Sequence, residues 1–150
     1  MDEQQLPDIS DIPIEDRLRR ATRLWHATFF ATIDYLREQG ISPVDFAHWL
    51  GRRFAPGWED MHGNMQKIAY YVALNAISTG SELQRYDVSD DEATIQLRMG
   101  QESEYEDDVD ALEHIYVPIM ESLDLDYEWE KVGEQEEVIR TVRLRRRAAA

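Results

Sequence analysis

The most informative absence from the 150-residue sequence is cysteine. Without it, disulfides, cysteine-ligated zinc sites and thiol catalysis are excluded. Long apolar runs are absent too, since none approaches the roughly 20 residues that a membrane-spanning helix needs. The acidic N-terminal stretch lacks the apolar core of a signal peptide. We therefore expect a cytoplasmic location.

Several functional motifs are also missing. The sequence has no glycine-rich phosphate loop, no G-x-S-x-G elbow and no arrangement typical of a catalytic triad. Positive charge is scarce, with 16 lysines and arginines against 31 acids and a net charge of -15. Such a surface repels nucleic-acid phosphates and anionic membranes, so we expect neither as a partner.

What the chain does contain is enough apolar material for one folded domain. Hydrophobic residues make up 43% of the sequence and aromatic residues 10%. This content separates the chain from disordered acidic polymers. We predict an acidic flexible tail over residues 1–12, a single α+β domain over 13–145 and a C-terminal tail over 146–150.

A long first helix is predicted over residues 17–40, ending at Gly40. Its apolar residues form two stripes, namely Trp25, Phe29, Ile33 and Leu36, and Leu24, Ala27, Ala31 and Tyr35. A small domain usually covers only one side of an N-terminal helix, and monomers seldom leave a second apolar side exposed. We therefore expect a homodimer through the first helix.

Hydrophobic periodicity predicts the remaining elements. A second helix should begin at Ser42 with Pro43 in its first turn, and a third should run from about Trp58 to Ser78. The period then changes from 3.6 to 2, which indicates a hairpin over 81–99. A fourth helix, kinked or split by Pro118, and a second hairpin over 125–145 follow. The predicted fold is α+β, with an antiparallel sheet covered by helices on one side.

The stretch "EYEDDVDALEHIYVP" (104–118) is rich in acids. On a helix, Asp107, Asp110 and His114 share a side and could hold a divalent ion or position a general base. We favour another interpretation, in which the acids face solvent and favour the helix dipole because Val109 and Leu112 point to the core. No metal site and no cofactor are therefore predicted.

Three other polar residues are candidates for special roles. His62 lies one turn from Glu59, and we interpret it as a helix-surface or pocket-lining residue. Asn75 interrupts an apolar helix, so it is either a buried amide that needs partners or a residue on the solvent side. Arg140 alternates with apolar residues on the last strand. It is either a buried cation that needs an anion or, as we favour, paired across the hairpin with Glu128 or Glu130.

From about residue 45 to 144, four stretches carry a family resemblance: "FAHWLGRRFAPGW", "ELQRYDVSDDEATIQLRM", "DALEHIYVPIMESLDLD" and "YEWEKVGEQEEVIRTVRL". In order and patterning they resemble the 4-vinyl reductase domain family, which shares its fold with haem-nitric-oxide-binding and Golgi-trafficking proteins. The resemblance implies a small α+β domain that binds apolar ligands between helices and sheet, and that often dimerises. That family often carries metal-binding cysteines near its final hairpin, and this chain has none.

The helix-rich first half also looks similar to the aminothiazoline-carboxylate hydrolase-like group, although no catalytic residue of that group can be matched. The leading hypothesis is a non-enzymatic small-molecule-binding or sensory domain for an apolar, aromatic or acidic ligand. Two alternatives stay open, a hydrolase-like enzyme using Asp110, His114 or His62, and a dimeric interaction module without a pocket. The predicted ligand-binding residues are Trp25, Phe29, Trp49, Trp58, His62, Tyr71, Asn75 and Tyr116.

Overall fold

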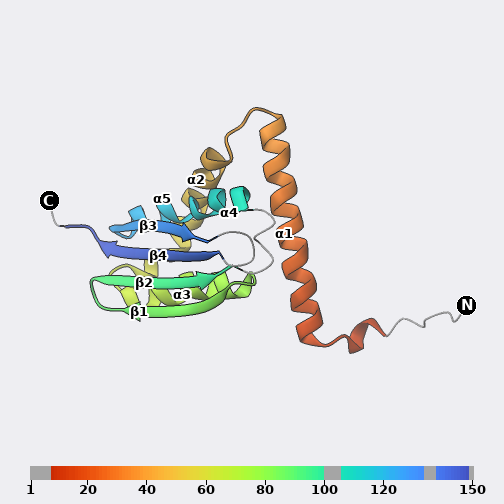
Figure 1. Ribbon diagram of the computed structural model, residues 1–150, viewed down its shortest axis with the longest axis horizontal. Coiled ribbons are helices and arrows are strands. Elements are labelled where there is room, and N and C mark those ends of the chain that lie inside the picture. The colour runs from red at the N-terminus through yellow and green to blue at the C-terminus, as the bar shows by residue number, and fades with distance from the viewer. Residues whose placement is uncertain (1–7, 100–105, 134–137, 149–150) are drawn as a thin grey trace, which may run out of the picture.

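The computed structural model describes residues 8–99, 106–133 and 138–148, with 106–109 described by backbone alone (Figure 1). It confirms the α+β fold class. In chain order, with η marking 3-10 helices, the elements are η1 (Ile9–Asp11), α1 (Ile14–Glu38), α2 (Pro43–Phe54), η2 (Ala55–Met61), α3 (Met65–Ser78), β1 (Glu82–Val88), β2 (Glu92–Arg98), α4 (Glu106–Glu113), α5 (Tyr116–Ser122), β3 (Leu125–Val132) and β4 (Ile139–Arg146).

The strands form one antiparallel sheet in the order β1-β2-β4-β3. Each hairpin pairs within itself, and β2 and β4 join the two hairpins at the centre of the sheet. Along β2, Ala93, Ile95 and Leu97 are buried, which confirms the alternation predicted there. Position 140 of β4 lies between Leu97 on one side and Lys131 on the other. Arg140 is therefore a central residue of the sheet.

The main hydrophobic core lies between the inner face of the sheet and the helices. Helix α3 packs against β1 and β2, and α5 packs against β3. The fully buried side chains of this core are Ile68, Ile95, Ile119, Met120, Val142 and Leu144. Helix α2 covers α4 and α5 from outside, and Gly51 makes this approach possible. A Cβ atom there would collide with the carbonyl oxygen of Ile115 and the side chain of Pro118.

Helix α1 stands beside the end of the sheet and runs across the direction of the strands (Figure 1). A second, smaller core anchors it, in which Phe29, Phe30 and Ile33 contact Met99 and Val138 at the ends of β2 and β4. The opposite side of α1, which carries Leu24, Ala31 and Tyr35, is exposed. The two apolar sides predicted for this helix are thus present, and the described part of the chain covers one of them.

The start of the third helix differs from the prediction, whereas the predicted break in the fourth helix is confirmed. The third helix begins at Met65 and not near Trp58, because Gly63 adopts φ +80° and Asn64 caps the helix by accepting from the Lys67 amide. The fourth helix is split into α4 and α5 before Pro118, as predicted.

The ends of the described chain carry structure inside the predicted tails. Helix η1 lies within residues 1–12, and β4 continues to Arg146, one residue into the predicted C-terminal tail. Among the described residues, no helix is both long enough and apolar enough to cross a membrane.

Candidate functional site

A cavity of about 240 Å³ lies between the inner face of the sheet and helices α3, α4 and α5, with α1 at its rim. Its apolar lining comes from Trp25, Phe54, Trp58, Val72, Ala76, Leu97, Met99, Leu112, Ile115, Ile119 and Val142. Its polar lining comes from Asn75, Thr79, Ser81, Glu113, Tyr116, Tyr127 and Arg140. Apolar walls with a few polar groups are typical of small-molecule sites.

Aromatic rings build one wall of the cavity. The Trp58 ring meets the Tyr116 ring edge to face, with centroids 6.1 Å apart. Tyr116 in turn stacks on Tyr127 at 5.3 Å. At the rim, Trp25 stacks on Phe29 at 5.5 Å while 46% of Trp25 stays exposed. These contacts fix the ring orientations, so the wall is largely preformed.

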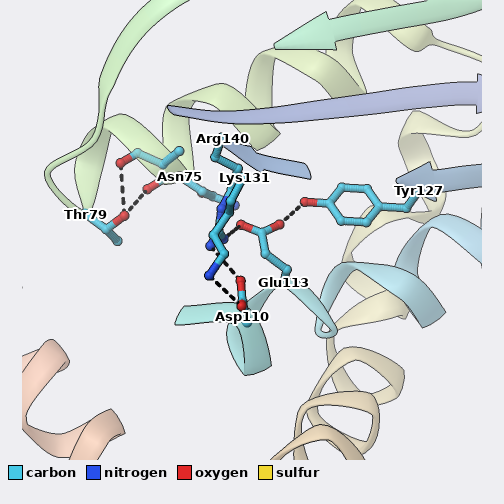
Figure 2. A network of polar contacts seen from close by, with 8 residues as sticks. Asn75, Thr79, Asp110, Glu113, Tyr127, Lys131 and Arg140 are labelled. Carbon is cyan, nitrogen blue, oxygen red and sulfur yellow. Dashed lines mark hydrogen bonds and ion pairs between the residues drawn. The ribbon is translucent and has the colours of Figure 1, made fainter. Parts of the chain in front are cut away.

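Glu113, Tyr127 and Arg140 at the polar end of the cavity belong to a charged network, which Figure 2 shows. Arg140 is only 2% exposed, and its two terminal nitrogens donate to Glu113 and to Asp110 Oδ1, the latter at 3.1 Å. The other Asp110 oxygen lies 2.7 Å from Lys131 Nζ. The Tyr127 hydroxyl donates to the second oxygen of Glu113. Two cations and two anions therefore balance one another.

The pairing favoured for Arg140 from the sequence is wrong. Glu130 pairs instead with Arg143, at 3.3 Å. The register of the hairpin explains the error, because Arg140 lies opposite Lys131, whereas Glu130 lies opposite Thr141. Alternate residues of a strand point to opposite faces of the sheet, so Glu130 lies on the outer face and Arg140 on the inner one.

The prediction that the acids of 104–118 face solvent is wrong for Glu113, whose side chain is 14% exposed, and in part for Asp110, at 38%. These two acids are three positions apart, so they share one side of α4, and that side faces Arg140. The side chain of Asp107 lies outside the described residues. Within the described ranges, no cluster of three or more histidines and acids could hold a metal ion.

Burial controls the ionisation of the two tyrosines in the cavity wall. It raises the pKa of Tyr127 well above its usual value, and the negative charge of Glu113 raises it further. Burial also raises the pKa of Tyr116 to about 12. Both phenols therefore stay protonated at neutral pH. The Tyr116 oxygen accepts a hydrogen bond from Asn75 Nδ2 at 3.2 Å, so its own O–H group is left to donate.

Four of the eight residues predicted to bind a ligand line this cavity. They are Trp25, Trp58, Asn75 and Tyr116. Asn75 is exposed, so the idea that it is a buried amide is wrong, yet its amide reaches the Tyr116 hydroxyl at the edge of the cavity.

The other four predicted residues lie elsewhere. Tyr71 packs behind Trp58, with centroids 6.5 Å apart, and Phe29 lies behind Trp25 in the smaller core. Trp49 is 45% exposed on α2, where its ring stacks on that of Phe46. His62 Nε2 lies 3.0 Å from Asp124 Oδ2 on the surface.

The groups of the hydrolase-like alternative do not converge on one point. Asp110 belongs to the charged network and His62 to its surface pair with Asp124. His114 Nδ1 lies 3.2 Å from His48 Nε2, and the His114 ring meets the edge of Trp129. Burial lowers the pKa of His114, and the neighbouring His48 lowers it further. The three groups therefore have three separate environments.

Sequence reasoning missed Tyr127 and Glu113 as lining residues. The alternation on β3 was a usable signal for Tyr127, because a strand that buries Leu125 must also turn residues 127, 129 and 131 inward. No comparable signal marks Glu113. No protein-family model matches the chain, and no curated protein matches its sequence.

Proposed function

We propose that the protein is a small-molecule-binding or sensory domain without catalysis, and that its ligand occupies the cavity beneath α4. The observation that carries this proposal is the combination of aromatic walls with a buried polar end in one cavity of about 240 Å³. For scale, an apolar cavity of about 150 Å³ is known to hold benzene. The volume therefore suits a molecule of one ring, or a short chain of similar size.

The order of elements, with a cavity between helices and sheet, supports a proposed kinship with 4-vinyl reductase domains in fold and in ligand binding. That kinship does not extend to the metal-binding cysteines of the family, since the chain has none. A cytoplasmic location belongs to the same proposal.

A pair of tryptophan variants tests the proposal. Trp58→Leu removes a ring that lines the cavity, whereas Trp49→Leu removes an exposed ring on the neighbouring helix α2. The purified protein would first be screened by thermal shift against neutral and acidic single-ring compounds. We expect the stabilising compounds to lose at least about tenfold in affinity on Trp58→Leu, as loss of a well-packed aromatic contact predicts. Trp49→Leu should leave their affinity unchanged.

A cavity-filling variant gives a second test of the proposal that removes no aromatic side chain. Ala76 lines the cavity from α3, and Ala76→Leu adds apolar volume there with a strong helix former. We expect this variant to fold and to lose binding. If no single-ring compound, neutral or acidic, stabilises the wild type, or if Ala76→Leu and Trp58→Leu bind as well as wild type, the proposed function is wrong.

We also propose a homodimer through the outer face of α1, which carries Leu24 at 55% exposure and Tyr35 at 61%. Between them the face holds the small residues Ala27, Thr28 and Ala31, which allow close helix approach. Arg17 lies on α1 towards one end of this face and Glu38 towards the other, so an antiparallel pair would bring opposite charges together.

The dimer proposal is tested by measuring the mass of the protein in high salt and in variants with an added charge. Two chains of net charge -15 repel each other, but salt limits this repulsion to about 10 Å at roughly 0.1 M ionic strength. Light scattering in high salt should therefore give the dimer mass, and Ala31→Glu and Tyr35→Glu should each give monomers. Gln66→Glu adds the same charge at an exposed position of α3 and should leave the dimer intact. A wild-type monomer mass at micromolar concentration contradicts the proposal, and a dimer that survives both α1 variants contradicts the choice of surface.

A further inference from the structure

We infer that the cavity takes a neutral, mainly apolar molecule that carries one hydrogen-bond acceptor, such as a ketone or ester carbonyl, and that it discriminates against carboxylic acids. This inference rests on the proposed function and names the chemical class of its ligand. Three features of the polar end of the cavity carry it, namely its charge balance, its spare donors and its volume.

The charge balance argues against an anionic ligand. Glu113 borders the cavity, and its two oxygens already accept from Arg140 and Tyr127. Arg140 is shared between Glu113 and Asp110, and Lys131 is held by Asp110. A ligand carboxylate would add a negative charge beside Glu113 with no cation of its own, and buried like charges are strongly unfavourable. The net charge of -15 opposes it at longer range.

The spare hydrogen-bonding groups at this end are donors. The Tyr116 hydroxyl accepts from Asn75, and no described residue accepts from its O–H group. The Arg140 Nε–H group is buried and likewise has no hydrogen-bond partner among the described residues. Tyr116 and Arg140 both line the cavity. A buried donor without an acceptor, such as the Arg140 Nε–H group, is costly, so the polar end favours a ligand that carries an acceptor. Tyr116 is the donor that we assign to the ligand.

The volume limits what the acceptor is attached to. At about 240 Å³, the cavity exceeds the roughly 150 Å³ that holds benzene but falls below the range of about 300–1,000 Å³ typical of drug-sized ligands. A single ring with one small carbonyl substituent fits between these limits. The ring would contact the aromatic wall around Trp58, and the carbonyl would reach the Tyr116 hydroxyl.

Three compounds of nearly equal shape separate the possibilities. Acetophenone carries a neutral acceptor, α-methylstyrene replaces the carbonyl oxygen by a methylene group, and benzoate carries a charge. Calorimetric titration of the purified full chain at neutral pH would give the three affinities. We expect acetophenone to bind about two- to tenfold tighter than α-methylstyrene, the value of one net hydrogen bond, and benzoate to bind most weakly.

The variant Tyr116→Phe removes the assigned donor and keeps the ring. We expect it to abolish the preference for acetophenone while α-methylstyrene binds within about twofold of wild type, because the apolar walls are unchanged. The ranking of the three compounds on wild type stands as a test even where this variant does not fold.

The outcomes distinguish this inference from the function on which it rests. If benzoate binds tightest, or if α-methylstyrene matches acetophenone, the ligand class is wrong while a small-molecule cavity stands. If acetophenone keeps its preference in Tyr116→Phe, the assignment of the donor is wrong. If none of the three compounds binds, both the proposed function and the inference fail.

Discussion

The inner face of β4 is buried from Arg140 to Leu144, but one part of it is apolar and the other part is charged. Leu144 faces the main hydrophobic core, where α3 and α5 cover the sheet with fully buried side chains, and Val142 lies between this core and the cavity. One position further along the same face, Arg140 is buried to the same degree but binds the acids of α4. A cavity lies beside it. A guanidinium cannot be dehydrated without counter-ions, so this end of the sheet is held by charge instead of close apolar packing.

The largest effect in this comparison is expected at the charged end. Arg140→Met removes the cation and leaves Glu113 buried without its main partner. We expect a loss of about 3–5 kcal/mol in the free energy of unfolding, measured with denaturant, because an unpaired buried charge is costly. Arg143→Met is the control, since Arg143 pairs with Glu130 on the outer face of the same strand. Removing such an exposed pair should cost less than about 1 kcal/mol.

A second variant shows whether the loss comes from charge. Adding Glu113→Gln to Arg140→Met removes the orphaned anion while keeping an acceptor for Tyr127. The double variant should recover part of the lost stability, and such coupling is expected between residues in direct contact. Equal stabilities for the single and double variants would show that the loss does not come from the unpaired charge of Glu113.

Shortening two leucines on the inner face of the sheet compares the packing in the main core with the packing beside the cavity. Leu144 is 0% exposed in the main hydrophobic core, whereas Leu97, which is 4% exposed, borders the cavity. Leu144→Ala should cost about 2–5 kcal/mol, because the rigid surroundings cannot close the new hole. Leu97→Ala should cost less, since part of its surface already lacks packing partners. Chemical denaturation of both variants gives the comparison, and a larger cost for Leu97→Ala would show that the cavity end is the better packed.

The seam between α2 and the α4–α5 pair is tightly packed at Gly51. Gly51→Ala places a methyl group against the backbone at Ile115, so the helices must separate, at about 1–3 kcal/mol. Gly57→Ala is the matched control, because a Cβ atom at Gly57 meets nothing within 4 Å. Thermal unfolding of the two variants measures the difference. Equal melting temperatures would mean that the seam is loose enough to accept the methyl group.

The smallest expected effect concerns pH, at the edge of the charged end. His114 follows the end of α4 and faces His48 from α2 and Trp129 from β3, with Asp110 and Glu113 on α4 nearby. Its pKa lies below the usual 6.5, because of burial first and His48 second. As the pH falls below 6.5, the unfolded chain binds a proton before the folded chain does, so stability falls and then levels off below the folded pKa.

His114→Gln should therefore flatten the fall in melting temperature between about pH 8 and pH 5, the range in which histidines titrate. His26, whose pKa burial also lowers, accounts for part of the slope that stays. Identical slopes for wild type and variant would show that His114 does not contribute.

Local patterns were enough to predict much of the fold. The alternation on β2, the N-cap at Ser42 and the break before Pro118 each act over a few residues, and each is found as expected. The start of α3 was missed because Gly63 and Asn64 create a cap inside a stretch that still reads as helical.

The candidate site was only half predictable, for a physical reason. Trp25, Trp58 and Tyr116 could be suspected from aromatic content, but the polar end depends on contacts between α4 and β4. Glu113 and Arg140 are 27 positions apart, and no local periodicity records that they meet. The sequence could show that Arg140 needed an anion on one face, whereas the hairpin register decided which anion it was.

Whether a ligand occupies the cavity is tested most directly by a methyl NMR titration of the protein labelled with ¹³C at its methionine methyl groups. Met99 lines the cavity, whereas Met61, Met65 and Met120 lie in the main hydrophobic core away from it. With acetophenone, we expect intermolecular NOEs and a clear shift at the Met99 methyl, with none at the three core methyls. NOEs only at the core methyls, or no NOE at any of the four, would contradict a ligand in the cavity beneath α4.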